Sequence, residues 1–330
     1  MNSNSTSTLR YDARVAADAQ ASPLYIVLNT GSGKSDSESP ANVISEVLRS
    51  AGRAHEIFEV DEAGRLEEIA RQAVAKALQN GGTVVAAGGD GTLNTVAQAT
   101  LGSGCPFGVI PQGTFNYFGR THGVPADTAE AARALLSARV EPVQVGLIND
   151  RIFLVNASLG LYPQSLEIRE EQKQRYGRSR VVAAWAGLLT IFRDYRPMLV
   201  KLEHDGGTRE LRTLTMVVGN NRLQLEQMGF EMQAIGEGRL AAVVLKPVSR
   251  LKLIWLFVRA ALGRLSRAED VETFTFRSLS VTPSTGRIRR LKVSTDGETT
   301  WMDTPLEFRI SGEQLLLLKP VDAVPETVHE

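Results

Sequence analysis

A short apolar run that ends in glycines constrains the fold of this chain more than any other stretch. Residues 84–87 are followed directly by residues 88–94, which read Gly-Gly-Asp-Gly-Thr-Leu-Asn. The run predicts a buried strand of a parallel sheet, and the glycines allow backbone N–H groups to approach an anion closely. Thr92 is predicted to cap a following helix, whose N-terminal dipole also favours a phosphate. Because Asp90 would repel a phosphate on its own, the stretch indicates a nucleotide site with Mg²⁺; an ordinary tight turn is the alternative.

Strands and helices alternate along the first part of the chain. Strands are predicted at residues 24–28, 55–60, 84–87 and 107–110, and helices at residues 40–50, 66–78, 93–101 and 126–138. This alternation is typical of a parallel α/β sheet, whose ligands bind beyond the carboxyl ends of the strands. Two more glycine-containing loops follow strands there, at residues 29–35 and 111–118. The first ends in Gly-Lys-Ser, but Leu28 stands where a P-loop needs a glycine, so a Walker A motif is excluded.

The second half of the chain has closely spaced strands, which indicate a mostly antiparallel β-sandwich. The predicted strands are residues 143–148, 152–158, 199–203, 211–218, 240–245, 272–276, 278–282, 291–295, 306–310 and 314–318, with helices at residues 181–192 and 251–265. We expect a disordered leader at residues 1–22, an α/β domain at residues 23–142, a β-sandwich domain at residues 143–320, and a tail at residues 321–330. The basic helix at residues 251–265 is either a core helix with a solvated face or a helix that lies on an anionic membrane.

Composition excludes several classes of protein. Lys+Arg and Asp+Glu both number 37, so no global field favours nucleic acid. The single Cys105 excludes an internal disulfide, fits a reducing cytoplasm and lacks an obvious partner for nucleophilic catalysis. No run approaches the ~20 apolar residues of a transmembrane segment, and the leader lacks the features of a signal peptide.

Two carboxylates stand close together near the end of the chain. Asp296 and Glu298 flank Gly297 after a predicted strand. On an extended chain, residues i and i+2 point the same way, so the pair could serve as a base and a metal ligand. A surface turn is the alternative.

These segments, in this order, resemble the catalytic domain of the diacylglycerol kinase family. The likeness is greater to its bacterial lipid kinases, which also resemble sphingosine kinases, and it covers about residues 24–320. The landmarks are Asn29-Thr30-Gly31-Ser32-Gly33, Gly88-Gly89-Asp90-Gly91-Thr92, Pro111-Gln112-Gly113-Thr114-Phe115-Asn116, Asn156-Ala157-Ser158-Leu159-Gly160, Gly219-Asn220-Asn221 and Asp296-Gly297-Glu298.

The resemblance implies phosphoryl transfer from ATP, with Mg²⁺, to the hydroxyl of a lipid such as diacylglycerol. It implies a cytoplasmic protein that meets its lipid substrate at the inner membrane face. The implied nucleotide-binding residues are Asn29, Thr30, Gly31, Ser32, Gly33, Gly88, Gly89, Asp90, Gly91, Thr92, Leu93, Asn94, Gly113, Thr114 and Asn116. The implied catalytic residues are Glu298, Asp296 and Asp90, and the implied metal site comprises Asp90, Ala234, Glu237 and Arg239. Glu298 is favoured over Asp296 as the base, but the residues alone do not decide between them.

The chain departs from the family pattern at several positions. It has Thr30 for proline, Val60 for threonine, Tyr117 for aspartate, Glu237 for aspartate, and residues 222–227 for a glycine-rich stretch. Two alternatives therefore stay open: an NAD kinase or another soluble-substrate kinase, and a non-catalytic nucleotide- or lipid-binding protein. The oligomeric state, including a homodimer, stays open as well.

Overall fold

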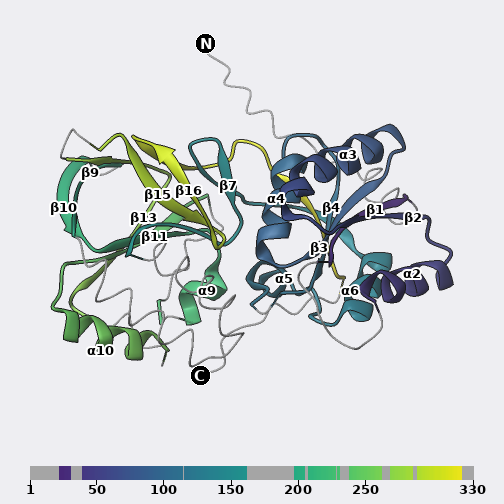
Figure 1. Cartoon of the computed structure of the whole chain (residues 1–330), viewed down its shortest axis with the longest axis horizontal. Coiled ribbons are helices and arrows are strands. Elements are labelled where there is room, and N and C mark those ends of the chain that lie inside the picture. Colours follow the sequence, from purple (N-terminus) through teal and green to yellow (C-terminus); the bar gives the residue numbers. More distant parts are fainter. Residues whose placement is uncertain are drawn as a thin grey trace, which may run out of the picture.

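The computed structural model describes residues 22–30, 39–113, 115–161, 197–204, 207–227, 229–230, 238–261, 268–284 and 288–321. These residues form two lobes that lie side by side (Figure 1). The first lobe is a sheet between helices, and the second is built from two antiparallel sheets. The expected combination of an α/β domain and a β-sandwich is confirmed.

The sheet of the first lobe has the strand order β2-β1-β3-β4-β18-β5. Its strands are β1 (Leu24–Asn29), β2 (His55–Val60), β3 (Thr83–Gly88), β4 (Phe107–Pro111), β5 (Arg139–Val143) and β18 (Leu315–Lys319). All neighbouring pairs are parallel except β18 with β5. A parallel sheet that is covered on both faces needs apolar residues on both, which explains the unbroken apolar runs of β1 and β3.

Helices cover both faces of this sheet. The helices are α2 (Pro40–Ser50), α3 (Leu66–Gln79), α4 (Asp90–Thr100), α5 (Tyr117–Thr121) and α6 (Thr128–Ser137), with a 3₁₀ turn at Ala63–Arg65. Successive residues of β1 point to opposite faces, so Ile26 packs with α2 and α6, while Val27 packs with α3 and α4. The loops beyond the carboxyl ends of the strands thereby stand on a rigid, buried base.

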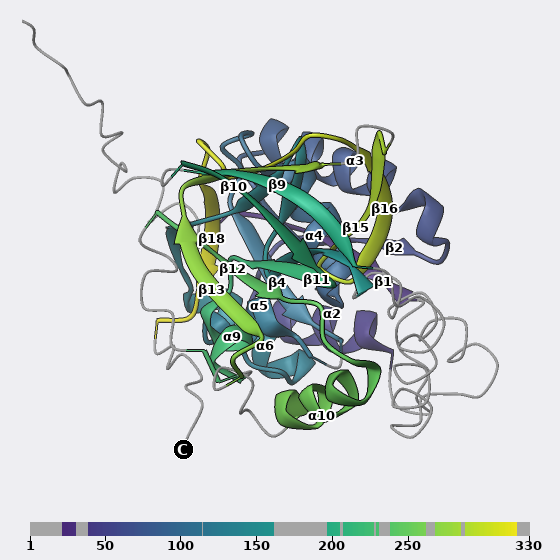
Figure 2. The same ribbon diagram turned by 90° about the vertical axis from the view of Figure 1, so that its left-hand side faces the viewer.

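The second lobe packs two six-stranded sheets, β10-β9-β14-β17-β6-β7 and β13-β12-β11-β8-β15-β16. The strands are β6 (Gly146–Ile148), β7 (Arg151–Phe153), β8 (Asn156–Gly160), β9 (Met198–His204), β10 (Gly207–Thr213), β11 (Thr215–Gly219), β12 (Leu240–Leu245), β13 (Val271–Phe276), β14 (Ser278–Pro283), β15 (Arg290–Thr295), β16 (Glu298–Asp303) and β17 (Leu306–Ile310). Side chains from both sheets, such as Phe153, Phe276 and Phe308, share one buried core. Two helices, α9 (Arg222–Gln227) and α10 (Arg250–Ala261), lie outside the sheets (Figure 2).

Several predictions about elements are wrong. The last strand does not continue the sandwich, because β18 returns to the first sheet between β4 and β5. Three of the expected strands are each split in two: residues 143–148 between β5 and β6, residues 152–158 between β7 and β8, and residues 211–218 between β10 and β11. The helix expected from residue 93 begins at Asp90, so Gly89, not Thr92, is its N-cap; the backbone of Gly89 is extended (φ −81°, ψ 177°) as a cap requires.

Some expectations lie outside the described residues. They are the helix at residues 181–192, nearly all of the leader, most of the tail, and the predicted site residues Gly31, Ser32, Gly33, Thr114, Ala234 and Glu237. In the part of the chain that is described, none of the helices combines the length and apolar character needed to cross a membrane.

Candidate active site

Three loops meet at the carboxyl ends of β1, β3 and β4. Asn29, the last residue of β1, donates a hydrogen bond from Nδ2 to Thr92 Oγ1 (2.9 Å), which joins the first loop to the second. The second and third loops touch through glycines, because a Cβ atom on Gly113 would lie 3.0 Å from Gly89 Cα. A larger residue at Gly113 would separate the two loops, so the described parts of all three loops form one small-residue cradle.

Asn116 shapes the third loop. Its backbone is left-handed (φ 49°), a conformation that asparagine tolerates, and its Oδ1 accepts a hydrogen bond from Gly113 N–H (2.9 Å). The backbone N–H groups of Asn116, Tyr117 and Phe118 face Asp90 and act to lower its pKa. The third loop therefore presents backbone donors to the carboxylate of the second.

Asp90 is the first residue of α4, and its Oδ1 is buried without a hydrogen-bond partner among the described residues. Its pKa is raised to about 6, chiefly by burial and then by the charge of Asp296, while the N–H groups at the start of α5 act in the opposite direction. A buried carboxylate oxygen without a partner is costly unless a ligand completes it. Asp90 therefore fits a hard cation such as Mg²⁺, which is commonly held by one or two carboxylates together with phosphate oxygens.

The late pair of carboxylates lies on a turn, which the sequence left open as the alternative, and not on an extended strand. Thr295 pairs with Glu298, and between them Asp296 (φ 48°) and Gly297 (φ 94°) form a two-residue hairpin turn. Positive φ at both central residues is the signature of a type I′ turn, for which Asp-Gly is a favoured sequence. The turn sends the two carboxylates to different environments.

Asp296 is buried and accepts four hydrogen bonds. Its Oδ1 accepts from the N–H groups of Val155 and Asn156 (both 2.9 Å), and its Oδ2 accepts from Leu154 N–H and Asn94 Nδ2 (both 2.7 Å). Burial raises the pKa of Asp296, and these donors oppose that rise. Because all four contacts are donors that fill both oxygens, the geometry fits the carboxylate form and leaves little capacity for a substrate proton.

The contact between Asp296 and Asn94 joins the two lobes. Asn94 lies on α4, and its Nδ2 also donates to Ile152 O (3.1 Å) in the second lobe. One turn further along α4, Gln98 Oε1 accepts from Ile152 N–H (2.9 Å). Figure 1 shows α4 beside β7 at this junction. Sequence reasoning assigned Asn94 to the nucleotide and did not identify Gln98 at all.

Glu298 begins β16 and extends toward the start of α4. A Cβ atom built on Gly91 would lie 2.6 Å from Glu298 Oε1, so the missing side chain of Gly91 leaves the space that Glu298 occupies. Approach to α4 partly desolvates the carboxyl and raises its pKa, Arg151 lowers it, and Asp296 raises it again. The residue remains accessible to solvent. An accessible carboxylate with a raised pKa is suited to accept a proton.

Two more asparagines of the expected landmarks, Asn220 and Asn221, make hydrogen bonds between distant segments. Asn221 Oδ1 accepts from Thr121 Oγ1 (3.0 Å) on α5, and Asn221 Nδ2 donates to Tyr117 O (3.3 Å). Asn220 Nδ2 donates to Gln144 O and Leu154 O, both at 3.1 Å. Asn221 therefore fixes the second lobe against α5 and the third loop, whereas Asn220 joins β11 to Gln144, between β5 and β6, and to Leu154. Spacing could not have identified Thr121 or Gln144, because their partners lie far away in the sequence.

Three more predicted site residues that the structure describes are Thr30, Leu93 and Arg239, and their side chains contact other parts of the protein. Thr30 Oγ1 donates to Val60 O (3.0 Å), so two of the departures from the family pattern contact each other. Leu93 is buried in the core and can contribute only its backbone to the cradle. Arg239 donates from its guanidinium to Thr275, while its carbonyl accepts from Gln144 Nε2 (3.2 Å). The described part of the chain contains no cluster of three or more potential metal-ligating His, Cys, Asp or Glu residues.

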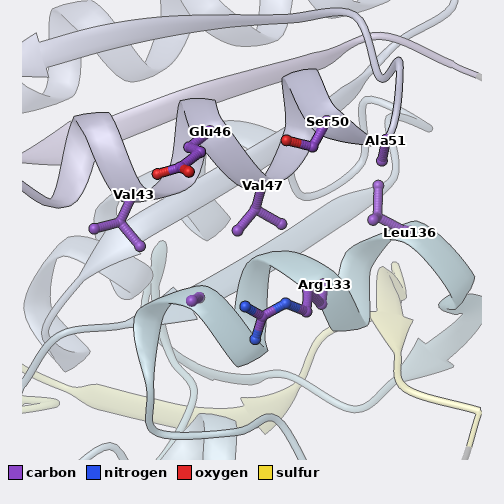
Figure 3. A pocket seen from close by; sticks show the side chains of 8 residues that line it. Val43, Glu46, Val47, Ser50, Ala51, Arg133 and Leu136 are labelled. Carbon is purple, nitrogen blue, oxygen red and sulfur yellow. The ribbon is translucent and has the colours of Figure 1, made fainter.

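A cavity of about 440 Å³ lies away from these loops, between α2 and α6. Figure 3 shows Val43 and Val47 of α2 pointing toward α6, which carries Arg133. None of its lining residues belongs to the three loops or to the hairpin. The buried Cys105 is equally remote from the chemistry: burial raises the pKa of its thiol to about 11, which keeps it protonated.

Two family models match this chain, one for each lobe. The diacylglycerol kinase catalytic domain matches residues 23–148, and the YegS C-terminal NAD kinase beta sandwich-like domain matches residues 169–319. A Bacillus subtilis protein named diacylglycerol kinase is 26% identical over 297 residues, which cover 86% of this chain and 91% of the relative. A Pseudomonas aeruginosa protein, named for its likeness to the lipid kinase YegS, is 39% identical over 114 residues, or 34% of this chain and 36% of the relative.

Solved structures give the same fold. The crystal structure of a diacylglycerol kinase from Bacillus anthracis has a TM-score of 0.66 at 22% identity, and the match covers 92% of this chain and 98% of that one. At this identity the likeness concerns the fold alone. Because the two family models lie on the two lobes and together span most of the sequence, this chain belongs to the diacylglycerol kinase catalytic-domain family, in the form that carries a YegS-type C-terminal domain.

Proposed function

We propose that this protein is an ATP- and Mg²⁺-dependent lipid kinase whose acceptor is diacylglycerol or a related lipid alcohol. The observation that carries the proposal is the meeting of the glycine cradle that contains Asp90 with Glu298 from the second lobe, whose Oε1 lies beside Gly91. Two relatives named diacylglycerol kinase match this chain over most of their own length, and their names support the choice of acceptor class.

The cradle and α4 would hold the phosphates. Gly89, Asp90 and Gly91 place backbone N–H groups at the positive end of the α4 dipole, which favours a phosphate. Asp90 would hold Mg²⁺ through its unpartnered Oδ1. The ion, bound to the nucleotide phosphates, would neutralise the charge that develops during phosphoryl transfer.

Glu298 is our choice for the base, and Asp296 for a positioning residue. The lipid hydroxyl oxygen forms a bond to the γ-phosphorus, and the bond from that phosphorus to the β–γ bridging oxygen breaks, so that ADP leaves. The hydroxyl proton passes to the carboxylate of Glu298. Asp296, with both oxygens occupied, instead holds the hairpin against Leu154 and Asn94, and so places Glu298 beside Gly91.

The test is transfer of labelled phosphate from ATP into a total lipid extract, with the product identified by mass spectrometry. We expect Mg²⁺-dependent labelling of a lipid alcohol, a loss of at least about 10²-fold in Glu298→Gln, and no measurable turnover in Asp90→Asn. ATP binding should persist in Glu298→Gln. Wild-type rates in either variant would overturn the role given to that residue.

A second candidate follows from the name of the second family model, which describes an NAD kinase-like sandwich. The same assay with NAD in place of lipid tests it: labelling of NAD without labelling of lipid would favour a soluble-substrate kinase. Labelling of neither, with tight ATP binding, would favour a non-catalytic nucleotide-binding protein.

A further inference from the structure

Helix α10 leaves two large apolar side chains in solvent. Leu251 is 78% exposed and Trp255 is 52% exposed, and the two lie one turn apart on the same side of the helix. The opposite side is not exposed: Leu253 and Leu256 are buried in a small cluster with Leu214. Figure 1 and Figure 2 both show α10 at the margin of the second lobe, outside its sheets. The fold therefore fixes the helix by one side and presents Leu251 and Trp255 on the other.

The charged residues in the segment that contains α10 are nearly all basic. Between Glu237 and Glu269 the sequence contains seven basic residues and no acidic one, although the chain as a whole has a net charge of zero. Three of the seven, Arg250, Lys252 and Arg259, lie on α10 itself. Asp270 pairs with Lys252 at 2.6 Å and offsets one of these charges. A helix that carries basic residues beside exposed apolar side chains is complementary to an anionic lipid surface.

Trp255 is placed as an interfacial tryptophan would be. The guanidinium of Arg259 lies 4.6 Å from the centre of its ring. Tryptophan and arginine both combine an apolar body with a polar or charged end, and this combination suits the boundary between headgroups and acyl chains. With 12 residues, α10 is too short to span a bilayer, so this helix could only lie along the surface.

We propose that α10 docks the protein on an anionic membrane, with Leu251 and Trp255 inserted among the lipids and the basic residues against the headgroups. The proposal rests on the proposed function for its purpose, because a kinase that phosphorylates a lipid must reach it in a bilayer. The physical binding, however, needs neither ATP nor Mg²⁺. The two ideas can therefore fail separately.

The binding experiment uses the full chain and tryptophan fluorescence without ATP or Mg²⁺. The chain has three tryptophans, so Trp185→Phe/Trp301→Phe leaves Trp255 as the reporter, and Trp185→Phe/Trp255→Phe leaves Trp301. Trp301 is a matched control, since it is 55% exposed and has Lys292 5.3 Å from its ring centre, but it lies on β16. Vesicles of phosphatidylcholine with phosphatidylglycerol should shift the emission of the Trp255 reporter to the blue. Vesicles of phosphatidylcholine alone should shift it much less.

The response should be confined to Trp255 and weakened by salt, because exposed charges are screened. Leu251→Ser/Trp255→Ser should bind anionic vesicles about tenfold more weakly than wild type, and Trp301→Ser should bind as wild type does. Since all three side chains are exposed, the variants should keep the wild-type melting temperature. Equal shifts from both reporters, no shift from Trp255, or wild-type binding by the double variant would each overturn the proposal.

Kinase assays separate this proposal from the proposed function. With a short-chain, water-dispersed diacylglycerol, Leu251→Ser/Trp255→Ser should keep activity within about twofold of wild type; with diacylglycerol in anionic vesicles it should lose about tenfold, in line with its lost binding. Insertion of Trp255 in a protein that phosphorylates no lipid would refute the proposed function and leave the docking surface supported. Activity on vesicles that is the same in the double variant and wild type would refute the docking surface alone.

Discussion

Asp90 and Asp296 are aspartates near each other at one site, but their hydrogen bonds differ. Asp296 has four N–H donors on its two oxygens, whereas Asp90 keeps a buried Oδ1 without a partner among the described residues. A fully satisfied carboxylate stabilises the protein, whereas an incompletely satisfied one costs stability and is typical of a ligand-binding position. Replacement of the two residues by asparagine should therefore have opposite effects on the free energy of unfolding.

Asp90→Asn should stabilise the ligand-free protein at neutral pH while it abolishes turnover. The pKa of Asp90 is raised to about 6, so the native state binds a proton more tightly than the unfolded state, and stability falls as pH rises from about 4 to about 6. The neutral asparagine avoids this cost, and we expect a gain of about 1–2 kcal/mol at pH 7.5 that disappears below pH 4. Urea denaturation at the two pH values measures it, with the exposed Asp150→Asn as control. Equal stability at pH 7.5 would contradict the argument.

Asp296→Asn should destabilise the protein by about 2–4 kcal/mol, because an amide places an N–H₂ group against backbone donors. Turnover should fall as well, since Glu298 would lose its support. Asp303→Asn, at the far end of β16, is the control: its side chain is 83% exposed beside Arg290, and a surface pair of this kind contributes little. If urea denaturation showed the same small loss in the free energy of unfolding for both variants, the role of Asp296 in joining the lobes would be wrong.

The start of α4 shows what a sequence can predict about an element and what it cannot. The glycines of residues 88–91 and the apolar run before them are local signals, and they placed a strand, a tight turn and a helix in the right order. The first residue of the helix was misplaced because Thr92 is a good capping residue, whereas the extended backbone of Gly89 takes that role. The reason for glycine at position 91 could not be predicted at all, since it is the side chain of Glu298, about two hundred residues later.

Gly91→Ala should separate stability from activity within this element. Alanine favours a helix over glycine by about 1 kcal/mol, but its Cβ would lie 2.6 Å from Glu298 Oε1 and displace that flexible side chain. We expect unchanged or slightly higher thermal stability with turnover reduced at least about tenfold, and little change in the KM for ATP. Gly64→Ala is the control, because no heavy atom lies within 4 Å of its added Cβ. Full activity in Gly91→Ala would remove Glu298 from the chemistry.

At the scale of the whole molecule, the chain leaves the first lobe after β5 and returns to it as β18. Local patterns predicted the two kinds of lobe, but they placed the last strand in the wrong one, because the pairing of β18 with β4 and β5 is set by contacts between distant residues. The boundary expected between residues 142 and 143 therefore marks only the first of two crossings between the lobes; the chain crosses back before β18. The sheet that carries the three site loops is complete only when residues 315–319 lie in place.

Leu317→Ala tests this dependence. Leu317 is fully buried beside Phe107 of β4, so its truncation should cost about 2–4 kcal/mol. The loss should appear in the first lobe: amide hydrogens of β3 and β4 should exchange faster, while those of β11 and β12 in the sandwich change less. Because the glycine loops begin where β3 and β4 end, the KM for ATP should rise in the same variant.

Leu78→Ala is the matched control, because Leu78 is a half-exposed leucine of the same lobe. If the two variants had equal stability and exchange, β18 would be an appendage of the sheet, and the nucleotide loops would not depend on the end of the chain.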